Sequence, residues 1–232
     1  MQHSFDFAML LGGKYHDWLI SGFLLSIRLL LAALVLSLLV AVVIAVMRLS
    51  DWMPLRVAGA AYVESIRNIP LLAHMLFWYF GAPEVLPAVV RKWLYSQNIE
   101  MMSALIALVL YTSAYMAEDI RSGIRSIPSQ QMEAGRSLGF SFLRTMHLVI
   151  LPQSLRLVVP PLISQTLNLW KNTSIAMVIG VAEMMFQASQ VESLTFRGFE
   201  PYAFATAGYI ALSMLITLCS HAYERRYPLR GA

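Results

Sequence analysis

Long apolar runs separated by short polar stretches make up most of the chain. A helix needs about 20 residues, at a rise of about 1.5 Å each, to cross about 30 Å of hydrocarbon. The least ambiguous run, LLLAALVLSLLVAVVIAVM at positions 29–47, is close to that length and carries no charge. The pattern predicts a single all-α membrane domain over 1–232, with five spanning helices at about 19–47, 57–80, 101–120, 159–181 and 203–223.

The composition supports a membrane protein and argues against two other interpretations. Hydrophobic residues make up 58% of the chain and charged residues 13%, whereas soluble domains average about 45–50% and about 25%. The net charge of +4 is better explained by basic cytoplasmic loops than by binding of nucleic acid. Arg28 interrupts the first apolar run and no small-residue cleavage site follows it, so we expect an uncleaved span and not a signal peptide.

The placement of lysine and arginine predicts which way the chain crosses the bilayer, because cytoplasmic loops carry the excess of these residues. Four lie on one side of the predicted spans: Lys14, Arg91, Lys92 and Arg197. Ten lie on the other side: Arg48, Arg56, Arg121, Arg125, Arg136, Arg144, Arg156, Arg225, Arg226 and Arg230. We therefore expect the N-terminus outside and the C-terminus in the cytoplasm.

A polar segment between the third and fourth spans, QQMEAGRSLGFSFLRTMHLVILP at 130–152, would then face the cytoplasm. Ser129 can cap a helix there, and Leu138, Phe142 and Met146 recur every four residues, as on one side of an amphipathic helix over about 129–143. Such a helix could lie on the membrane surface. It could instead dock on a partner protein, because the small residues of EAG and Gly139 would allow close approach.

Charged and amide side chains inside the second span are candidates for a substrate pathway, because a charge at the bilayer centre costs at least ~2.5 kcal/mol. Glu64, Arg67 and Asn68 share one helix face, and Pro70 removes a backbone donor beside them. Two interpretations follow. Either Glu64 and Arg67 form an internal ion pair that holds helices together, or Arg67 binds a substrate carboxylate.

The fourth span carries a second polar stripe. Gln165, Asn168 and Asn172 repeat at helical spacing, Lys171 lies beside them, and Thr173 extends the patch. A stripe of this kind is too costly to expose to lipid, so it either lines a pathway or forms hydrogen bonds between helices.

The remaining ionisable residues form no recognisable catalytic or metal-binding set. Glu118 and Arg121, at the cytoplasmic end of the third span, can pair within a charge network that includes Asp119 and Arg125. A role in gating is the alternative for this network. Because the histidines are scattered, we predict no metal site, no cofactor held by this chain and no enzyme activity.

The cytoplasmic segment resembles the EAA loop of ABC-importer permeases, whose pattern is Glu-Ala-Ala, three residues, Gly, nine residues, an aliphatic residue, one residue, then Leu-Pro. The matching positions are Glu133, Ala134, Gly139, Val149, Leu151 and Pro152, with Gly135 at the second alanine. Three further stretches are similar to permeases of the histidine, glutamine, glutamate, arginine and opine family: YVESIRNIPLLAHMLFWYFGAP at 62–83, AYMAEDIRSGIRSIPSQQMEA at 114–134 and TLNLWKNTSIAMVIGVAEM at 166–184.

This resemblance implies a type I (MetI-like) importer fold and a role as the permease subunit of a bacterial inner-membrane uptake system for polar amino acids. The cytoplasmic helix would be a coupling helix that docks on a separate ATPase subunit, and that subunit would bind ATP and Mg²⁺. The chain itself has no Gly-x-x-x-x-Gly-Lys-Ser/Thr loop. Further partners would be the lipid bilayer, a second permease subunit (identical or different) and an extracytoplasmic amino-acid-binding protein. The coupling residues would be Glu133, Ala134, Gly135, Leu138, Gly139 and Phe142.

Two features of the sequence bear on the substrate. KNTS at 171–174 and MMFQASQVESLTF at 184–196 are slightly more similar to permeases for acidic amino acids. Arg67 and Lys171 would suit a dicarboxylate, although both could equally bind the α-carboxylate alone. We therefore expect glutamate or aspartate ahead of glutamine, histidine or arginine. An ion channel and a membrane-embedded enzyme are the alternative functions.

Overall fold

The computed structural model describes residues 5–227, and every regular element in that range is helical. Arg230, counted above among the cytoplasmic cations, lies outside the described residues. The long helices are α1 (Lys14–Leu49), α2 (Met53–Arg67), α6 (Ile99–Arg125), α9 (Leu151–Asn172) and α11 (Phe199–Arg226). The shorter elements are η1 (Phe7–Leu10), α3 (Leu71–Leu76), the π-helical turn η2 (Phe77–Gly81), α4 (Ala82–Val85), α5 (Ala88–Ser96), α7 (Ser129–Ser137), α8 (Phe142–Thr145), the π-helical turn η3 (Met146–Ile150), the 3₁₀ helix η4 (Thr173–Ile179) and α10 (Met184–Thr195).

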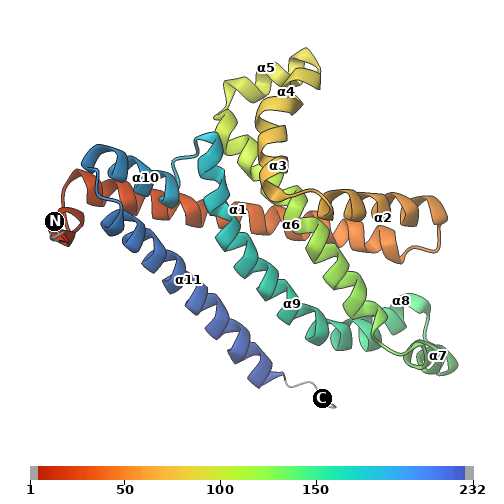
Figure 1. The fold of residues 1–232 in the computed structure, drawn as a ribbon. Coiled ribbons are helices and arrows are strands. Elements are labelled where there is room, and N and C mark those ends of the chain that lie inside the picture. The colour runs from red at the N-terminus through yellow and green to blue at the C-terminus, as the bar shows by residue number, and fades with distance from the viewer. Residues whose placement is uncertain (1–4, 228–232) are drawn as a thin grey trace.

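Helix α1 is the element against which the other long helices pack. Figure 1 shows α2 folded back along the C-terminal half of α1. Helices α6, α9 and α11 run obliquely to α1, and α9 lies between α6 and α11. Small residues make the contact with α6 close: Ala33 and Ala41 of α1 and Ala104 and Ala107 of α6 are fully buried. In a membrane, where lipid is as apolar as leucine, small residues let helix backbones approach.

Trp170 of α9 joins three of these helices in the core. Its side chain is fully buried. The indole N–H donates to the carbonyl of Tyr209 on α11 at 3.1 Å, and its ring makes a T-shaped contact with Phe23 on α1, with 6.1 Å between centroids. A buried indole needs a partner for its N–H, so this bond fixes the position of α9 relative to α11.

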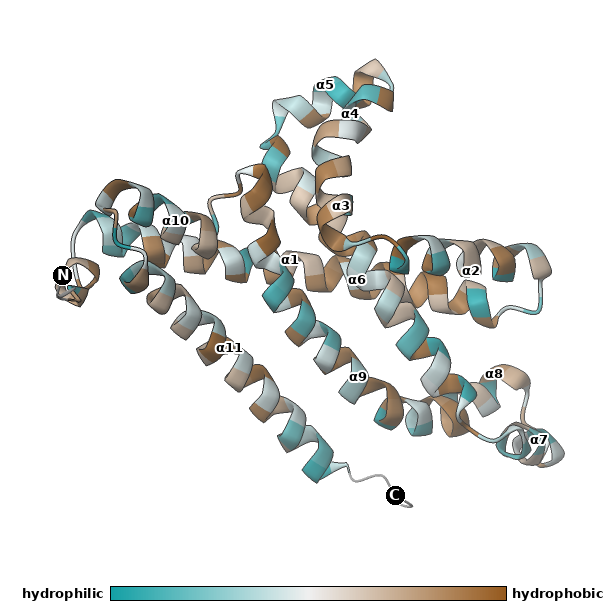
Figure 2. Ribbon diagram, viewed as in Figure 1, coloured by the Kyte–Doolittle hydropathy of each residue, from teal (hydrophilic) through white to brown (hydrophobic). Residues whose placement is uncertain are grey.

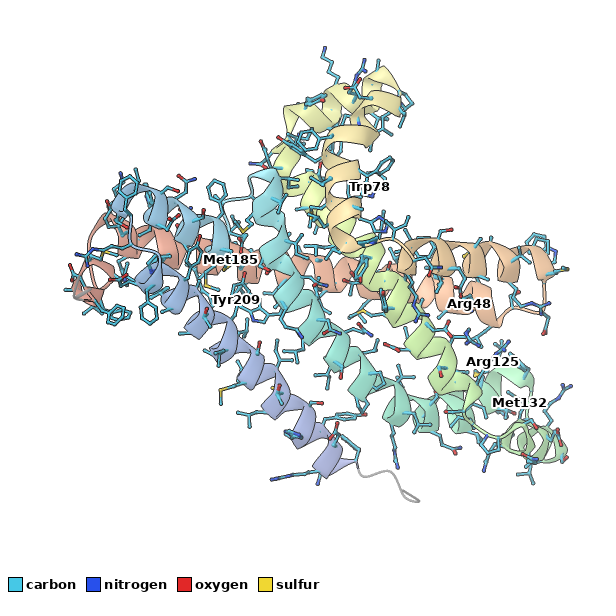
Figure 3. All side chains as sticks on the ribbon, viewed as in Figure 1. Arg48, Trp78, Arg125, Met132, Met185 and Tyr209 are labelled. Atoms are coloured by element: carbon cyan, nitrogen blue, oxygen red, sulfur yellow. The ribbon has the colours of Figure 1, made fainter. Side chains whose placement is uncertain are left out.

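A buried carboxylate fixes the far end of the bundle. Glu183 caps α10 by accepting from the Phe186 backbone N–H at 2.9 Å. It also accepts from Ser26 of α1 at 3.2 Å and from the Tyr209 hydroxyl of α11 at 2.9 Å. Figure 3 shows Tyr209 and Met185 at this junction. Three helices are therefore tied together by one fully buried side chain.

Four stretches of the described chain are long and apolar enough to cross a membrane: Lys14–Leu49, Ile99–Arg125, Phe142–Ile179 and Phe199–Arg226. By contrast, Figure 2 shows hydrophilic residues at α7 and at the C-terminal end of α11. The segment 57–80 is not among the four, and the prediction of one continuous helix there is wrong. Helix α2 ends at Arg67, and Pro70 is extended, with a ψ of 141°. Since proline has no N–H to continue the ladder, α3 starts in a new direction (Figure 1).

The fourth predicted span begins earlier than expected and ends differently. Helix α9 starts at Leu151 and not near 159, directly after η3. In this π-helical turn the Leu151 N–H bonds to the carbonyl of Met146, and the wider turn leads into Pro152, which has no N–H to donate. After Asn172 the chain tightens into η4 and leaves it at Gly180, whose φ of +90° suits glycine.

Candidate functional site

A polar cavity of about 530 Å³ lies between α6 and α9. Its lining comes from successive turns of the two helices: Tyr111, Thr112 and Tyr115 from α6, and Gln165, Asn168, Leu169, Lys171 and Asn172 from α9. The amide stripe of α9 thus faces the polar stripe of α6 and not the lipid, as the cost of exposing amides to hydrocarbon requires.

Hydrogen bonds connect the amides of α9 to α6. The Gln165 Nε2 donates to the Asp119 carboxylate at 3.0 Å, and the Asn168 Nδ2 donates to the Gln165 Oε1 at 3.5 Å. Asn172 also lines the cavity. These contacts give the cavity a row of oriented amide groups along one wall.

Lys171 supplies a cation without a counter-charge. It is exposed and lines the cavity. Within the described residues no carboxylate lies within 4.0 Å of its ammonium group, and the cavity lining includes no aspartate or glutamate. An unpaired cation in a membrane-embedded cavity attracts an anionic ligand group, because the low local dielectric strengthens the interaction.

Arg67 reaches the edge of the cavity through a tyrosine. Its guanidinium carbon lies 5.0 Å from the centroid of the Tyr115 ring, and the Tyr115 hydroxyl is 3.5 Å from the Arg67 carbonyl. Glu64 is exposed and makes no ion pair with Arg67 in the part of the chain that the structure covers. The interpretation of Glu64 and Arg67 as an ion pair is therefore wrong. What binds the Arg67 cation is the face of an aromatic ring.

The predicted pathway residues thus fall into two groups. Asn168, Lys171 and Asn172 line one cavity. The others do not line it: Glu64 and Arg67 are exposed, Asn68 caps α2 by donating to the Glu64 carbonyl at 2.8 Å, and Thr173 is fully buried and donates to the Trp170 carbonyl at 2.8 Å.

Tyr111, Thr112 and Tyr115 were not singled out from the sequence, although they form the α6 wall. The signal was present but weak. Polar positions recur in the third span one turn apart and lead directly to Glu118 and Asp119. Tyrosine is also common at membrane interfaces, so its hydroxyl does not by itself indicate a cavity.

The predicted pair of Glu118 and Arg121, both on α6, is confirmed, and a residue of a second helix joins it. Glu118 contacts the Arg121 guanidinium, and its Oε2 lies 2.6 Å from the Arg48 Nη1 of α1. Figure 3 shows Arg48 at this end of the molecule. Asp119, the next residue of α6, bonds to Gln165 of the cavity wall, so the charge cluster lies next to that wall.

The segment predicted to face the cytoplasm is not one helix over 129–143, and Ser129 is its first helical residue, not its cap. Helix α7 ends at Ser137 in a Schellman motif, in which the Phe140 N–H bonds to the Gly135 carbonyl at 3.1 Å and the Gly139 N–H to the Arg136 carbonyl at 2.9 Å. Gly139 has a φ of +82°. The four-residue periodicity continues past this turn into α8, which is why the sequence pattern did not reveal it.

The two glycines of this segment have different roles. Gly135 is buried, and its missing side chain makes room for Thr145. Gly139 has nothing within 4 Å of where a Cβ would be, so it is required for its backbone conformation. Glu133, Ala134, Leu138 and Phe142 are exposed, Leu138 at 77% and Phe142 at 54%. Helices α7 and α8 thus form a tip with exposed apolar side chains, at the ends of α6 and α9 (Figure 1).

No group of three or more histidine, cysteine, aspartate or glutamate residues in the described range could hold a metal ion. His74 is buried, and its Nε2 lies 3.3 Å from the Ile66 carbonyl, which gives this ring a structural partner across the break between α2 and α3.

A family model described as "Binding-protein-dependent transport system inner membrane component" matches residues 37–227. The chain belongs to this family. Two similar relatives are the probable glutamine ABC transporter permease protein GlnM of Bacillus subtilis (strain 168), 39% identical over 95% of this chain and 94% of the relative, and the glutamate/aspartate import permease protein GltJ of Escherichia coli (strain K12), 32% identical over 94% and 90%. The predicted resemblance to ABC-importer permeases is confirmed. Like these relatives, this permease is a membrane subunit and not an enzyme.

Solved structures confirm the fold of the permease. A chain of "Crystal structure of an amino acid ABC transporter with histidines" superposes with a TM-score of 0.84 at 32% identity, covering 96% of this chain and 99% of that one. A chain of the MetNI methionine ABC transporter in an inward-facing conformation gives a TM-score of 0.74 at 16% identity, over 94% of this chain and 100% of that chain. The second likeness shows the fold alone, the type I (MetI-like) importer fold that the sequence predicted.

Proposed function

We propose that this chain is the permease subunit of an ATP-driven importer for a polar amino acid, and that it forms the transport pathway together with a second permease subunit. The observation that carries the proposal is the polar cavity between α6 and α9, with the unpaired Lys171 in its wall. A zwitterionic substrate always brings a carboxylate, and a cation in a cavity of low dielectric is a suitable partner for it.

The chemistry of the cavity favours an acidic substrate. Its lining includes no carboxylate among the described residues, and Asp119, the carboxylate of α6 that bonds to the lining, already accepts from Gln165. A cationic side chain such as arginine would therefore meet Lys171 without a counter-charge. A second carboxylate would meet the Lys171 cation and the amide of Asn172, which also lines the cavity. We therefore propose glutamate or aspartate, with glutamine next. Relatives named for glutamine, glutamate/aspartate and arginine all match this chain, and so do not decide between these substrates.

The tip formed by α7 and α8 supports coupling to a separate ATPase subunit. It presents exposed apolar residues, Leu138 and Phe142, beside the exposed Glu133. An apolar patch of this kind at the end of a membrane protein is typical of a docking surface. ATP and Mg²⁺ would be bound by the partner, so this chain would need no cofactor of its own. With the tip in the cytoplasm, the N-terminus would be outside, where an amino-acid-binding protein would deliver the substrate.

Uptake into proteoliposomes tests this function directly. The permease would be reconstituted with its ATPase, its partner permease and the binding protein, and uptake of labelled glutamate, aspartate, glutamine and arginine would be measured with and without ATP. We expect ATP-dependent uptake of glutamate or aspartate and little of arginine. Uptake of none of these amino acids, or a current that does not depend on ATP, would disprove the proposal.

A further inference from the structure

Asp119 contacts the wall of the cavity without lining it. The residue lies on α6, half-buried, and its Oδ2 accepts from the Gln165 Nε2 of α9 at 3.0 Å. Gln165 and Asn168 line the cavity, whereas Asp119 does not. Asp119 therefore contacts the cavity only through Gln165, the lining residue to which it bonds.

The chemistry of a carboxylate fixes the direction of this chain of hydrogen bonds. An ionised aspartate can only accept, so Gln165 must turn its NH₂ group toward Asp119 and its oxygen away. That oxygen is then an acceptor, and the Asn168 Nδ2 is 3.5 Å from it. Asn168 in turn is left with its Oδ1 pointing away from Gln165. No donor in the described part of the chain bonds to this oxygen. The orientations of both amides are thus set by which neighbouring groups can donate a hydrogen bond and which can only accept one.

An acceptor and a cation then lie one helical turn apart on the same wall. Asn168 and Lys171 are three residues apart on α9, which corresponds to about 4.5 Å along the helix axis. Both line the cavity. An amino acid carries its ammonium and carboxylate groups on one carbon, so an oxygen next to a cation matches the two charged groups of its backbone.

We propose that Asp119 is a positioning residue for substrate selectivity: through Gln165 it holds Asn168 with its oxygen toward the cavity, where that oxygen accepts from the α-ammonium group of the substrate. This inference rests on the proposed function. It assigns a role to a side chain that does not touch the substrate, and it explains why a carboxylate is placed behind an amide instead of in the cavity itself.

The test compares two ligands that differ only in the ammonium group. L-glutamate and glutarate share both carboxylates, and glutarate lacks the α-amino group. Binding of each to the purified complex of permease subunits and ATPase in nanodiscs, without binding protein, reports the selectivity of the membrane site alone. In the Asp119→Asn variant Gln165 can turn over, because asparagine also donates, and Asn168 can then present NH₂ to the cavity. We expect glutamate affinity to fall about tenfold or more, the size of one hydrogen bond to a charged group, with glutarate affinity unchanged.

Two further variants separate positioning from packing. Asp119→Asn combined with Gln165→Glu exchanges the two groups, so that position 165 again accepts from Asn168, and the preference for glutamate over glutarate should return. Gln165→Leu interrupts the relay while keeping Asp119, and the same loss of preference is expected if Asp119→Asn fails to assemble. Asp51→Asn, an exposed carboxylate at the turn between α1 and α2, is the matched control and should change neither affinity.

The outcomes distinguish this inference from the proposed function. If wild-type complex binds glutamate but Asp119→Asn keeps the same preference over glutarate, or loses both affinities in parallel, Asp119 is structural and the inference is wrong while the proposed function stands. If wild-type complex binds none of glutamate, aspartate, glutamine and arginine, the proposed function fails and the inference fails with it.

Discussion

Gly135 of α7 packs against Thr145 of α8 so closely that a side chain at position 135 would not fit. A Cβ atom at position 135 would lie 2.9 Å from the Oγ1 and 3.2 Å from the Cβ of Thr145. Thr145 is fully buried, and its hydroxyl donates to the Ser141 carbonyl at 3.1 Å, so it has little freedom to move aside. This contact holds α7 against α8, and the sequence had suggested instead that Gly135 makes room for a partner protein.

Gly135→Val is therefore expected to destabilise the tip itself. Overpacking of a close contact costs about 1–3 kcal/mol, and the melting temperature of the purified permease should fall. Ala134→Val, at the exposed neighbouring position, is the matched control and should leave the melting temperature unchanged. Equal melting temperatures for the two variants would show that α7 and α8 do not depend on this contact.

At Gly139 the constraint is the reverse of that at Gly135, because a side chain would have room there but the backbone conformation is unusual. Its φ of +82° is left-handed, and a Cβ atom added there would have no neighbour within 4 Å. Asparagine tolerates this conformation, whereas a β-branched residue does not. Gly139→Asn should keep ATP-driven uptake, and Gly139→Val should lose most of it. If Gly139→Asn loses uptake as strongly as Gly139→Val does, the loss is caused by side-chain bulk at a docking surface, as the sequence first suggested, and not by the turn.

Docking is best tested at the exposed apolar residues of the tip. Leu138 and Leu143 are 77% and 76% exposed, so replacing either with serine should leave the melting temperature of the permease unchanged. Removing a leucine from a buried interface costs about 2 kcal/mol or more. Leu138→Ser combined with Leu143→Ser should therefore reduce the amount of ATPase subunit that co-purifies. Full recovery of the ATPase with the double variant would place the docking surface elsewhere.

Much of this architecture could be predicted from the sequence, and the exceptions have physical causes. The class of fold and the polar stripe of α9 followed from hydropathy and helical spacing. The end of α7 did not, since Leu138 and Phe142 keep a four-residue spacing on both sides of a turn that only the φ of Gly139 reveals. The contact of Arg67 with Tyr115 joins residues 48 positions apart, and no local pattern records it.

The orientation in the membrane is open to a direct test. With Cys219 replaced by serine, single cysteines would be placed at Ser96 at the end of α5 and at Ser129 at the start of α7, both exposed positions. The excess of cations on the α7 side predicts that an impermeant maleimide labels position 96 in intact cells and position 129 only after permeabilisation. The reverse result would put the tip outside the cell, where it could not meet an ATPase.

Lys171 and Arg67 were predicted together as carboxylate-binding cations, and the structure leads us to expect different behaviour from them. Lys171 lines the cavity, whereas Arg67 lies over the Tyr115 ring at its edge. Lys171→Met removes the charge and keeps the length, and should weaken substrate binding about ten- to a hundredfold, the range for a hydrogen bond between charged groups. ATP hydrolysis without substrate should continue. Lys92→Met, an exposed lysine of α5, is the matched control.

Arg67→Lys should change substrate affinity much less than Lys171→Met does, because lysine also carries a charge that can lie over an aromatic ring. Arg67→Met should have the larger effect of the two changes at this position, since it removes that charge and leaves Tyr115 free to move at the cavity edge. Equilibrium binding of L-glutamate to the same nanodisc complexes measures all of these variants on one scale. If Arg67→Lys weakens binding as strongly as Lys171→Met, the planar guanidinium itself contacts the carboxylate, and the site extends beyond the cavity between α6 and α9 to the end of α2.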